Sequence, residues 1–277
     1  MHETGQFSTK TGVTLFEQEW LPDGPVRGHV VLLHGFGDHS SRYGYVAERF
    51  NGAGIAVHAY DQQGHGRSPG KRAYIPRFET LLADLDDFLE HVRPRIGKAP
   101  WFFMGHSMGG NVLTRFAETR SFDARGLIFS SPFLGLNADV PPLLLKVASV
   151  LSVVTPWLPV GAVDNTGLSR DPEKVKEADD DPFTFHGKVA ARTGAEFNRV
   201  IHLCEWDFGR ITAPSLVFHG TQDKVVPPSG SQRLYDGMRS KDKTLKYFEG
   251  GYHELWNDLC AEEVMDDILV WVEKRLA

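Results

Sequence analysis

A serine, an aspartate and a histidine follow one another along the chain in an order that suits nucleophilic catalysis. Ser107 is the centre of Gly105-His106-Ser107-Met108-Gly109, whose glycines permit a tight turn that exposes the serine hydroxyl. Asp223 follows an apolar run at 215–219, and His253 lies near the carboxyl end of the chain. A serine hydroxyl needs a base to take its proton and an acid to orient that base. The order therefore predicts acyl transfer with Ser107 as nucleophile, His253 as base and Asp223 as its partner.

Acyl transfer also needs two N–H groups that stabilise the negative oxygen of the tetrahedral intermediate. We expect one from Met108, the residue after the nucleophile, just before a predicted helix at 111–119. We expect the other from Phe36, because Gly35 and Gly37 on either side let the backbone expose its amide. A simple tight turn is the alternative interpretation of these glycines.

Short apolar runs predict the strands that would position these residues. Buried parallel strands are continuous apolar segments, which occur here at 29–34, 55–60, 101–104, 126–130, 215–219 and 245–248. An alternating segment at 13–20 is expected to pair with 5–9 as an opening hairpin. Apolar residues at helical spacing predict an amphipathic helix at 78–92, with Pro94 beyond its end. Alternating strands and helices predict an α/β fold with a mostly parallel central sheet covered by helices on both faces.

One segment interrupts this alternation, because no strand run occurs between 136 and 208. We interpret it as an inserted helical cap, with the core formed by residues 1–135 and 209–277. Within it, 143–154 is apolar on nearly all sides but is shorter than the roughly 20 residues of a membrane span. Three interpretations are open for 143–154: a helix buried between cap and core, a wall that binds an acyl chain, or a surface that enters a lipid interface.

The composition argues against several classes of protein. The 277 residues carry a formal net charge of −6, which leaves no basic surplus for binding nucleic acid. Cys204 and Cys260 lie far apart and no H-E-x-x-H motif occurs among the 12 histidines, so we expect neither a disulfide framework nor a metal site. The chemistry is predicted to need no cofactor. The first 10 residues lack the apolar stretch of a secretory signal, so we expect a cytoplasmic protein, and the sequence leaves its oligomeric state open.

Four motifs occur in a fixed order over the first half of the chain. They are His34-Gly35, Asp38-His39-Ser40-Ser41-Arg42-Tyr43, Asp61-Gln62-Gln63-Gly64-His65-Gly66-Arg67-Ser68 and Gly105-His106-Ser107-Met108-Gly109-Gly110. This ordered set resembles the monoacylglycerol lipase and lysophospholipase branch of the α/β-hydrolases, and the similarity continues over nearly the whole chain. The resemblance implies the α/β-hydrolase fold, a triad of Ser107, Asp223 and His253, and oxyanion donors from Phe36 and Met108. It also implies that the segment around 136–208 caps a long acyl tunnel.

The same resemblance implies residues that hold the glycerol end of a substrate. These are Asp38 and Arg42, in the loop after an early strand, and His106, the residue before the nucleophile. A second interpretation is open for each of them. Asp38 and Arg42 would form an ion pair within the loop, and His106 would brace the turn at Ser107.

The main hypothesis is a serine hydrolase that cleaves monoacylglycerols to glycerol and free fatty acid through an acyl-enzyme intermediate. Its expected partners are a lipid ester and, transiently, a membrane or micelle surface that the cap contacts. The protein would then be peripheral to the membrane. A lysophospholipase or a short-chain carboxylesterase would use the same triad on another substrate. A non-catalytic binding module predicts a damaged triad, which the sequence does not have. A cofactor-free haloperoxidase or carbon–carbon hydrolase would use a similar triad on the same fold.

Overall fold

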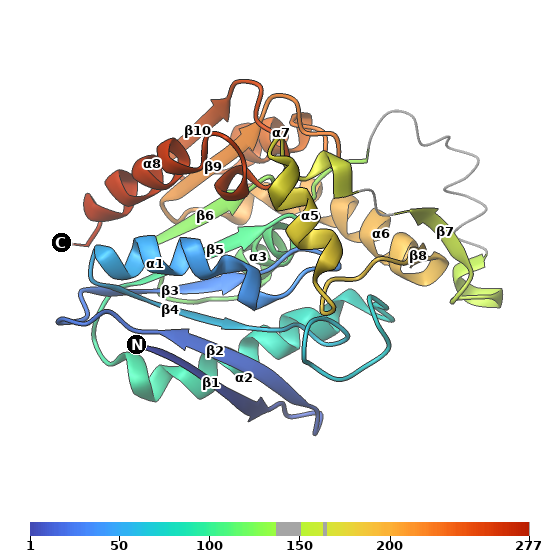
Figure 1. Ribbon diagram of the computed structural model, residues 1–277, viewed down its shortest axis with the longest axis horizontal. Coiled ribbons are helices and arrows are strands. Elements are labelled where there is room, and N and C mark those ends of the chain that lie inside the picture. Colours follow the sequence, from blue (N-terminus) through green and yellow to red (C-terminus); the bar gives the residue numbers. More distant parts are fainter. Residues whose placement is uncertain (137–150, 163–164, 277) are drawn as a thin grey trace.

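A sheet of eight strands runs through the computed structural model, which describes residues 1–136, 151–162 and 165–276 (Figure 1). The strands lie in the order β1-β2-β4-β3-β5-β6-β9-β10. β2 pairs antiparallel with both β1 and β4, and the other neighbours are parallel. The strands span His2–Ser8 (β1), Thr14–Trp20 (β2), Gly28–Leu33 (β3), Ile55–Tyr60 (β4), Trp101–His106 (β5), Gly126–Ser130 (β6), Ser215–Gly220 (β9) and Lys243–Phe248 (β10). The predicted opening hairpin and mostly parallel sheet are confirmed.

Helices cover both faces of this sheet, and β3 shows how the strands divide the core. Val31 and Leu33 belong to one cluster of buried apolar side chains, whereas Val30 and Leu32 belong to another, because successive side chains of a strand point to opposite faces. α2 and α3 pack in the first cluster, and α1 and α8 pack in the second. The α-helices whose bounds lie within the described residues span Gly44–Gly52 (α1), Phe78–Ile96 (α2), Met108–Thr119 (α3), Pro172–Asp180 (α5), Ala191–Asp207 (α6), Ser229–Gly237 (α7) and Ala261–Glu273 (α8). Short 3-10 helices span Ser40–Tyr43 (η1), Asn165–Gly167 (η2), Phe208–Arg210 (η3) and Leu255–Asn257 (η4).

The predicted end of the helix at 78–92 is wrong, because α2 continues through Pro94 to Ile96. A proline inside a helix removes one N–H donor, here the donor to the carbonyl of the residue four positions earlier, Glu90. Glu90 is exposed, so water can hydrate that carbonyl and the helix tolerates the loss in its last turn. The helix ends at Gly97, whose φ of 65° is readily adopted by glycine.

The absence of strands predicted for 136–208 is also wrong. β7 (Pro159–Ala162) and β8 (Lys188–Ala190) form a two-stranded antiparallel sheet. These strands have 4 and 3 residues and pair across a long sequence separation, so neither produces a recognisable period. Figure 1 shows β7 and β8 beside α6, away from the amino-terminal hairpin. The division into a core at 1–135 and 209–277 with a cap at 136–208 stays a prediction.

The apolar stretch at 143–154 can be followed only at its end. Residues 143–150 lie outside the described residues, and residues 151–154 are helical. Val153 and Val154 are exposed there, at 76% and 69%, whereas Ser152 is buried, so two of these apolar side chains are not covered by cap or core. Over the part of the chain that the structure describes, no helix combines the length and the apolar character needed to cross a membrane.

Candidate active site

Four loops bring the predicted functional residues to one edge of the sheet. Parallel strands end on the same side, so the segments that follow β3, β5, β9 and β10 emerge next to one another. Phe36 follows β3, Ser107 follows β5, Asp223 follows β9 and His253 follows β10. The topology therefore gathers residues that are separated by more than 200 positions in the sequence.

Ser107 lies on a sharp turn between β5 and α3, with φ 51° and ψ −115°. A positive φ is unfavourable for a residue with a side chain, so the surrounding structure must impose this turn. The glycines of the motif explain how the turn fits. A Cβ added to Gly105 would lie 2.4 Å from the Gly109 carbonyl oxygen, and one added to Gly109 would lie 2.2 Å from the Leu33 carbonyl oxygen. The two glycines thus allow close backbone contacts in which a residue with a Cβ would not fit.

Backbone hydrogen bonds hold the turn at Ser107 in place. The Ser107 N–H donates to the Ser130 carbonyl over 3.0 Å, and the Ser107 carbonyl accepts from the Phe133 N–H over 2.9 Å. Met108 is the first residue of α3, so its N–H belongs to the helix terminus and has no partner one turn earlier within the helix. The positive end of the helix dipole therefore lies next to the Ser107 side chain.

His253 and Asp223 form a buried pair. The His253 Nδ1 atom lies 2.7 Å from Asp223 Oδ2, and the other carboxylate oxygen accepts from the N–H groups of Val225 and Val226 at 2.8 and 2.9 Å. Burial would raise the pKa of Asp223, but the imidazoles of His253 and His219 hold it well below its usual range. Burial would lower the pKa of His253, but Asp223, followed by Glu254 and Asp38, raises it above its ordinary value. Asp223 is therefore a carboxylate that stabilises a proton on His253.

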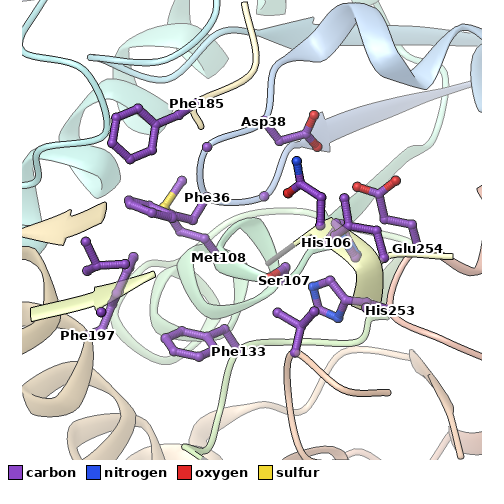
Figure 2. A pocket seen from close by; sticks show the side chains of 18 of the residues that line it. Phe36, Asp38, His106, Ser107, Met108, Phe133, Phe185, Phe197, His253 and Glu254 are labelled. Atoms are coloured by element: carbon purple, nitrogen blue, oxygen red, sulfur yellow. The ribbon is translucent and has the colours of Figure 1, made fainter. Parts of the chain in front are cut away.

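Ser107 and His253 line the same pocket, which has a volume of about 400 Å³. This is large enough for a small-molecule ligand. Figure 2 shows Ser107 near its middle, with aromatic side chains on one side and carboxylates on the other. The aromatic side is formed by Phe36, Phe133, Phe185 and Phe197, which meet edge to face at centroid distances of 5.1 to 6.2 Å. The other side carries Asp38 and Glu254.

Phe36 and Met108 line the same pocket as Ser107, and their role as oxyanion donors stays a prediction. The loop that carries Phe36 is held by the segment between α5 and β8. The Phe185 N–H donates to the Gly37 carbonyl over 2.7 Å, and His39 Nε2 lies 3.0 Å from Asp181 Oδ2. The position of the Phe36 amide therefore depends on contacts with a segment more than 140 residues further along the chain.

Asp38 and Arg42 form the ion pair that was one of their two predicted interpretations. Arg42 Nη1 lies 3.0 Å from Asp38 Oδ1, and the same guanidinium meets both oxygens of Glu254 at 2.8 and 2.7 Å. Tyr43 donates its hydroxyl to Asp38 Oδ2 over 2.8 Å. Burial opposes ionisation of Asp38, but Arg42 holds the pKa of Asp38 well below its usual range. All three charged groups line the pocket, so the ion pair does not remove them from the site.

His106 lines the pocket and also packs behind the turn at Ser107. Its Nδ1 lies 3.2 Å from the Ser130 hydroxyl, and its ring meets Trp256 edge to face at a centroid distance of 4.5 Å. Burial, with the nearby imidazole of His253, lowers the pKa of His106 well below its ordinary value. His106 is thus a neutral group in contact with both the turn and the pocket.

Sequence reasoning gave no role in the site to three neighbours of these residues. Glu254 follows His253 directly in the chain, and Trp256 lies three positions after it. His219 precedes Asp223 by four residues, and its Nε2 lies 3.0 Å from Asp223 Oδ2. Proximity in sequence to His253 and Asp223 was a signal for all three, although it did not specify their contacts. Over the described ranges, the His, Cys, Asp and Glu side chains form no group of three that could hold a metal ion.

Known proteins resemble this chain in architecture and in sequence. Residues 24–260 match the family described as serine aminopeptidase, S33. A monoacylglycerol lipase of Mycolicibacterium smegmatis is 36% identical over 98% of this chain and 96% of its own length, and a caffeoylshikimate esterase of Arabidopsis thaliana is 34% identical over 98% and 85%. The crystal structure of Paleococcus ferrophilus monoacylglycerol lipase has 36% identity and a TM-score of 0.85, covering 94% of this chain and 99% of that one. The predicted resemblance is therefore confirmed, and this chain belongs to the serine aminopeptidase, S33, family of α/β-hydrolases.

Proposed function

We propose that this protein is a serine hydrolase that cleaves monoacylglycerols to glycerol and free fatty acid. The observation that carries the proposal is the two-sided pocket, in which Ser107 lies between aromatic side chains and a pair of carboxylates. A monoacylglycerol has matching halves, because its ester joins a long acyl chain to a small polyol. The relatives named as monoacylglycerol lipases support the same substrate class.

In the proposed mechanism, Ser107 Oγ attacks the ester carbonyl while His253 Nε2 takes the hydroxyl proton. Asp223 Oδ2 accepts from His253 Nδ1, which fixes the tautomer and stabilises the imidazolium. The N–H groups of Phe36 and Met108 bind the negative oxygen of the tetrahedral intermediate. Glycerol leaves with the proton from His253, and a water activated by the same imidazole then releases the fatty acid from the acyl-enzyme.

The carboxylate side of the pocket favours an uncharged head group. Arg42 is paired with both Asp38 and Glu254, so these three side chains together carry one negative charge. Asp38 Oδ2 accepts from Tyr43 and Glu254 Oε1 accepts from Arg42, which leaves each oxygen a lone pair for a further donor. Two glycerol hydroxyls can donate there, whereas the phosphate of a lysophospholipid would meet like charge. We therefore propose Asp38, Arg42 and His106 as head-group residues, with Glu254 added to them.

The test compares initial rates on 1-monooleoylglycerol, oleoyl-lysophosphatidylcholine and a short-chain nitrophenyl ester. The monoacylglycerol should give the highest kcat/KM, and Ser107→Ala should lower kcat at least about 10⁴-fold on every substrate. Ser240→Ala is the matched control, because Ser240 is buried and bonded to the Asp242 carbonyl outside the pocket. Retained activity in Ser107→Ala would refute the mechanism. A wide preference for the short ester would keep the mechanism and refute the substrate.

We also propose that the segment at 151–158 contacts the lipid surface from which the substrate comes. Val153, Val154 and Trp157 are 76%, 69% and 62% exposed, and the following strand, β7, contributes Val160 to the pocket lining. Exposed apolar side chains next to the pocket suit a membrane or micelle interface. This contact is compatible with the cytoplasmic location expected from the sequence.

Vesicle sedimentation tests the lipid contact. Trp157→Asp should reduce sedimentation with phosphatidylcholine vesicles several-fold, and should leave hydrolysis of a short soluble ester unchanged. Trp206→Asp is the control, because Trp206 is 87% exposed but lies on α6 and does not line the pocket. Equal vesicle binding by Trp157→Asp and the unmodified protein would contradict the proposal.

A further inference from the structure

Asp223 is approached by two imidazoles rather than one. His253 Nδ1 lies 2.7 Å from Asp223 Oδ2, and His219 Nε2 lies 3.0 Å from the same oxygen. His219 is the fifth residue of β9 and its side chain is fully buried. No water can substitute for it without entering the core, so its contact with Asp223 is part of the fixed environment of the carboxylate.

The partners of His219 determine which of its nitrogens carries a hydrogen. Nε2 faces the Asp223 carboxylate and lies 3.2 Å from the Val226 carbonyl, and both of these groups only accept hydrogen bonds. Nε2 must therefore be the donor. Nδ1 lies 2.7 Å from the hydroxyl of Ser231, a buried residue of α7 that can donate to it. Ser231 thus orients the His219 ring so that its Nε2–H lies against both the Val226 carbonyl and the Asp223 oxygen used by His253.

Other charged and titratable groups also face this chain, and they set the background against which His219 acts. Asp38 and Glu254 stabilise a proton on His253, whereas His106 opposes it. Among the described residues, the charged and titratable groups around His253 and Asp223 include Asp38, Arg42, His106, His219, Lys224 and Glu254. Arg42 forms ion pairs with Asp38 and Glu254. The Lys224 ammonium lies 4.3 Å from the ring centroid of Tyr252. Among the described side chains, imidazole nitrogens of His253 and His219 lie 2.7 and 3.0 Å from Asp223 Oδ2.

We propose that His219 is a positioning residue that shares Asp223 Oδ2 with His253 and thereby limits how strongly Asp223 holds a proton on His253. This inference rests on the proposed function, in which neutral His253 must accept the proton of Ser107. A donor from His219 withdraws part of the carboxylate charge. Without that donor, the whole charge acts on His253, the imidazolium becomes more stable, and less of the neutral base is present near neutral pH.

The test is the pH dependence of kcat/KM on a soluble nitrophenyl ester, from about pH 5 to about pH 9. His219→Met removes the donor with little change in side-chain size, and should move the midpoint of the acid limb upward by about 0.5 to 1 unit. At about pH 6 this shift corresponds to a kcat/KM lower by roughly three- to tenfold, and the decrease in kcat/KM should be much smaller at about pH 9. His219→Gln keeps an N–H donor and should return the midpoint towards that of the unmodified enzyme.

An unchanged midpoint in His219→Met would overturn the inference, and so would equal shifts in His219→Met and His219→Gln, since these indicate only a packing role. If His219→Met does not fold, Ser231→Ala replaces it, because loss of the Ser231 hydroxyl releases the orientation of His219. Its midpoint should move upward by a smaller amount, and no movement would again overturn the inference. Ser107→Ala separates the two proposals. If Ser107→Ala stays active, the proposed function is refuted. If Ser107→Ala is inactive but His219→Met and the unmodified enzyme have equal acid-limb midpoints, only the role of His219 is refuted.

Discussion

Removal of the Arg42 guanidinium should destabilise the protein strongly and in a pH-dependent manner. In Arg42→Met, an apolar side chain of similar length would leave the Asp38 and Glu254 carboxylates facing each other without a cation. The three side chains are only 11%, 7% and 5% exposed, so solvent screens little of the repulsion. Breaking a buried ion pair by removing one partner typically costs about 3–5 kcal/mol of unfolding free energy.

The protonation of a carboxylate sets an upper limit on this loss. The variant can relieve the repulsion by binding one proton, which at pH 7 costs about 4 kcal/mol for a group with an ordinary pKa near 3.9. At pH 5 the same step costs only about 1.5 kcal/mol. In the unmodified protein the pKa of Asp38 is held below its ordinary value, so Asp38 is ionised at both pH values. Its contribution to the free energy of unfolding is therefore the same at about pH 5 and about pH 7. The difference between variant and unmodified protein should therefore shrink from about 4 to about 1.5 kcal/mol as the pH falls.

Urea unfolding at about pH 7 and about pH 5, followed by circular dichroism, measures this difference. Arg120→Met is the matched control, because the Arg120–Asp86 pair is 38% exposed on both sides and should contribute at most about 1 kcal/mol at either pH. Arg42→Met combined with Glu254→Gln should recover part of the loss. A loss below about 1 kcal/mol for Arg42→Met, equal at both pH values, would refute the reasoning.

Three further substitutions test other contacts. Gly109→Ala places a Cβ 2.2 Å from the Leu33 carbonyl oxygen, so urea unfolding should show a loss of at least about 2 kcal/mol, and a variant of normal stability would contradict this packing. Asp84 is 1% exposed with no hydrogen-bond partner among the described residues, and burial raises its pKa to about 7. The contribution of Asp84 to stability should therefore fall as the pH rises from about 4 to about 7, and Asp84→Leu should raise the Tm more at about pH 8 than at about pH 4. Equal gains would argue against a charged Asp84. Asp181→Ala removes the partner of His39 beside the Phe36 loop, and steady-state kinetics on a soluble ester should show kcat about tenfold lower with a smaller change in KM. An unchanged kcat would separate that contact from the oxyanion site.

The sequence contained the elements that depend on local pattern. Continuous apolar runs marked the buried strands, because a strand covered on both faces has no polar side, and each run corresponds to a strand of the sheet. The glycines around Ser107 indicated the turn, because a Cβ at Gly105 or Gly109 would clash with backbone atoms nearby. The order of Ser107, Asp223 and His253 was sufficient to propose a mechanism, since parallel strands bring the loops that follow them to one edge.

Tertiary structure decided the contacts between residues that are distant in sequence. Arg42 meets Glu254 across 212 positions, and His39 meets Asp181 across 142. β7 and β8 are too short to show a period, and they exist because each supplies the hydrogen-bonding partner of the other. The pairing of His219 with Asp223 likewise depends on where β9 ends relative to the loop that follows it. Periodicity and turn chemistry depend on a few neighbouring residues, so they can be recognised in the sequence. The partner of a side chain is fixed by packing and strand register, which exist only in the folded chain.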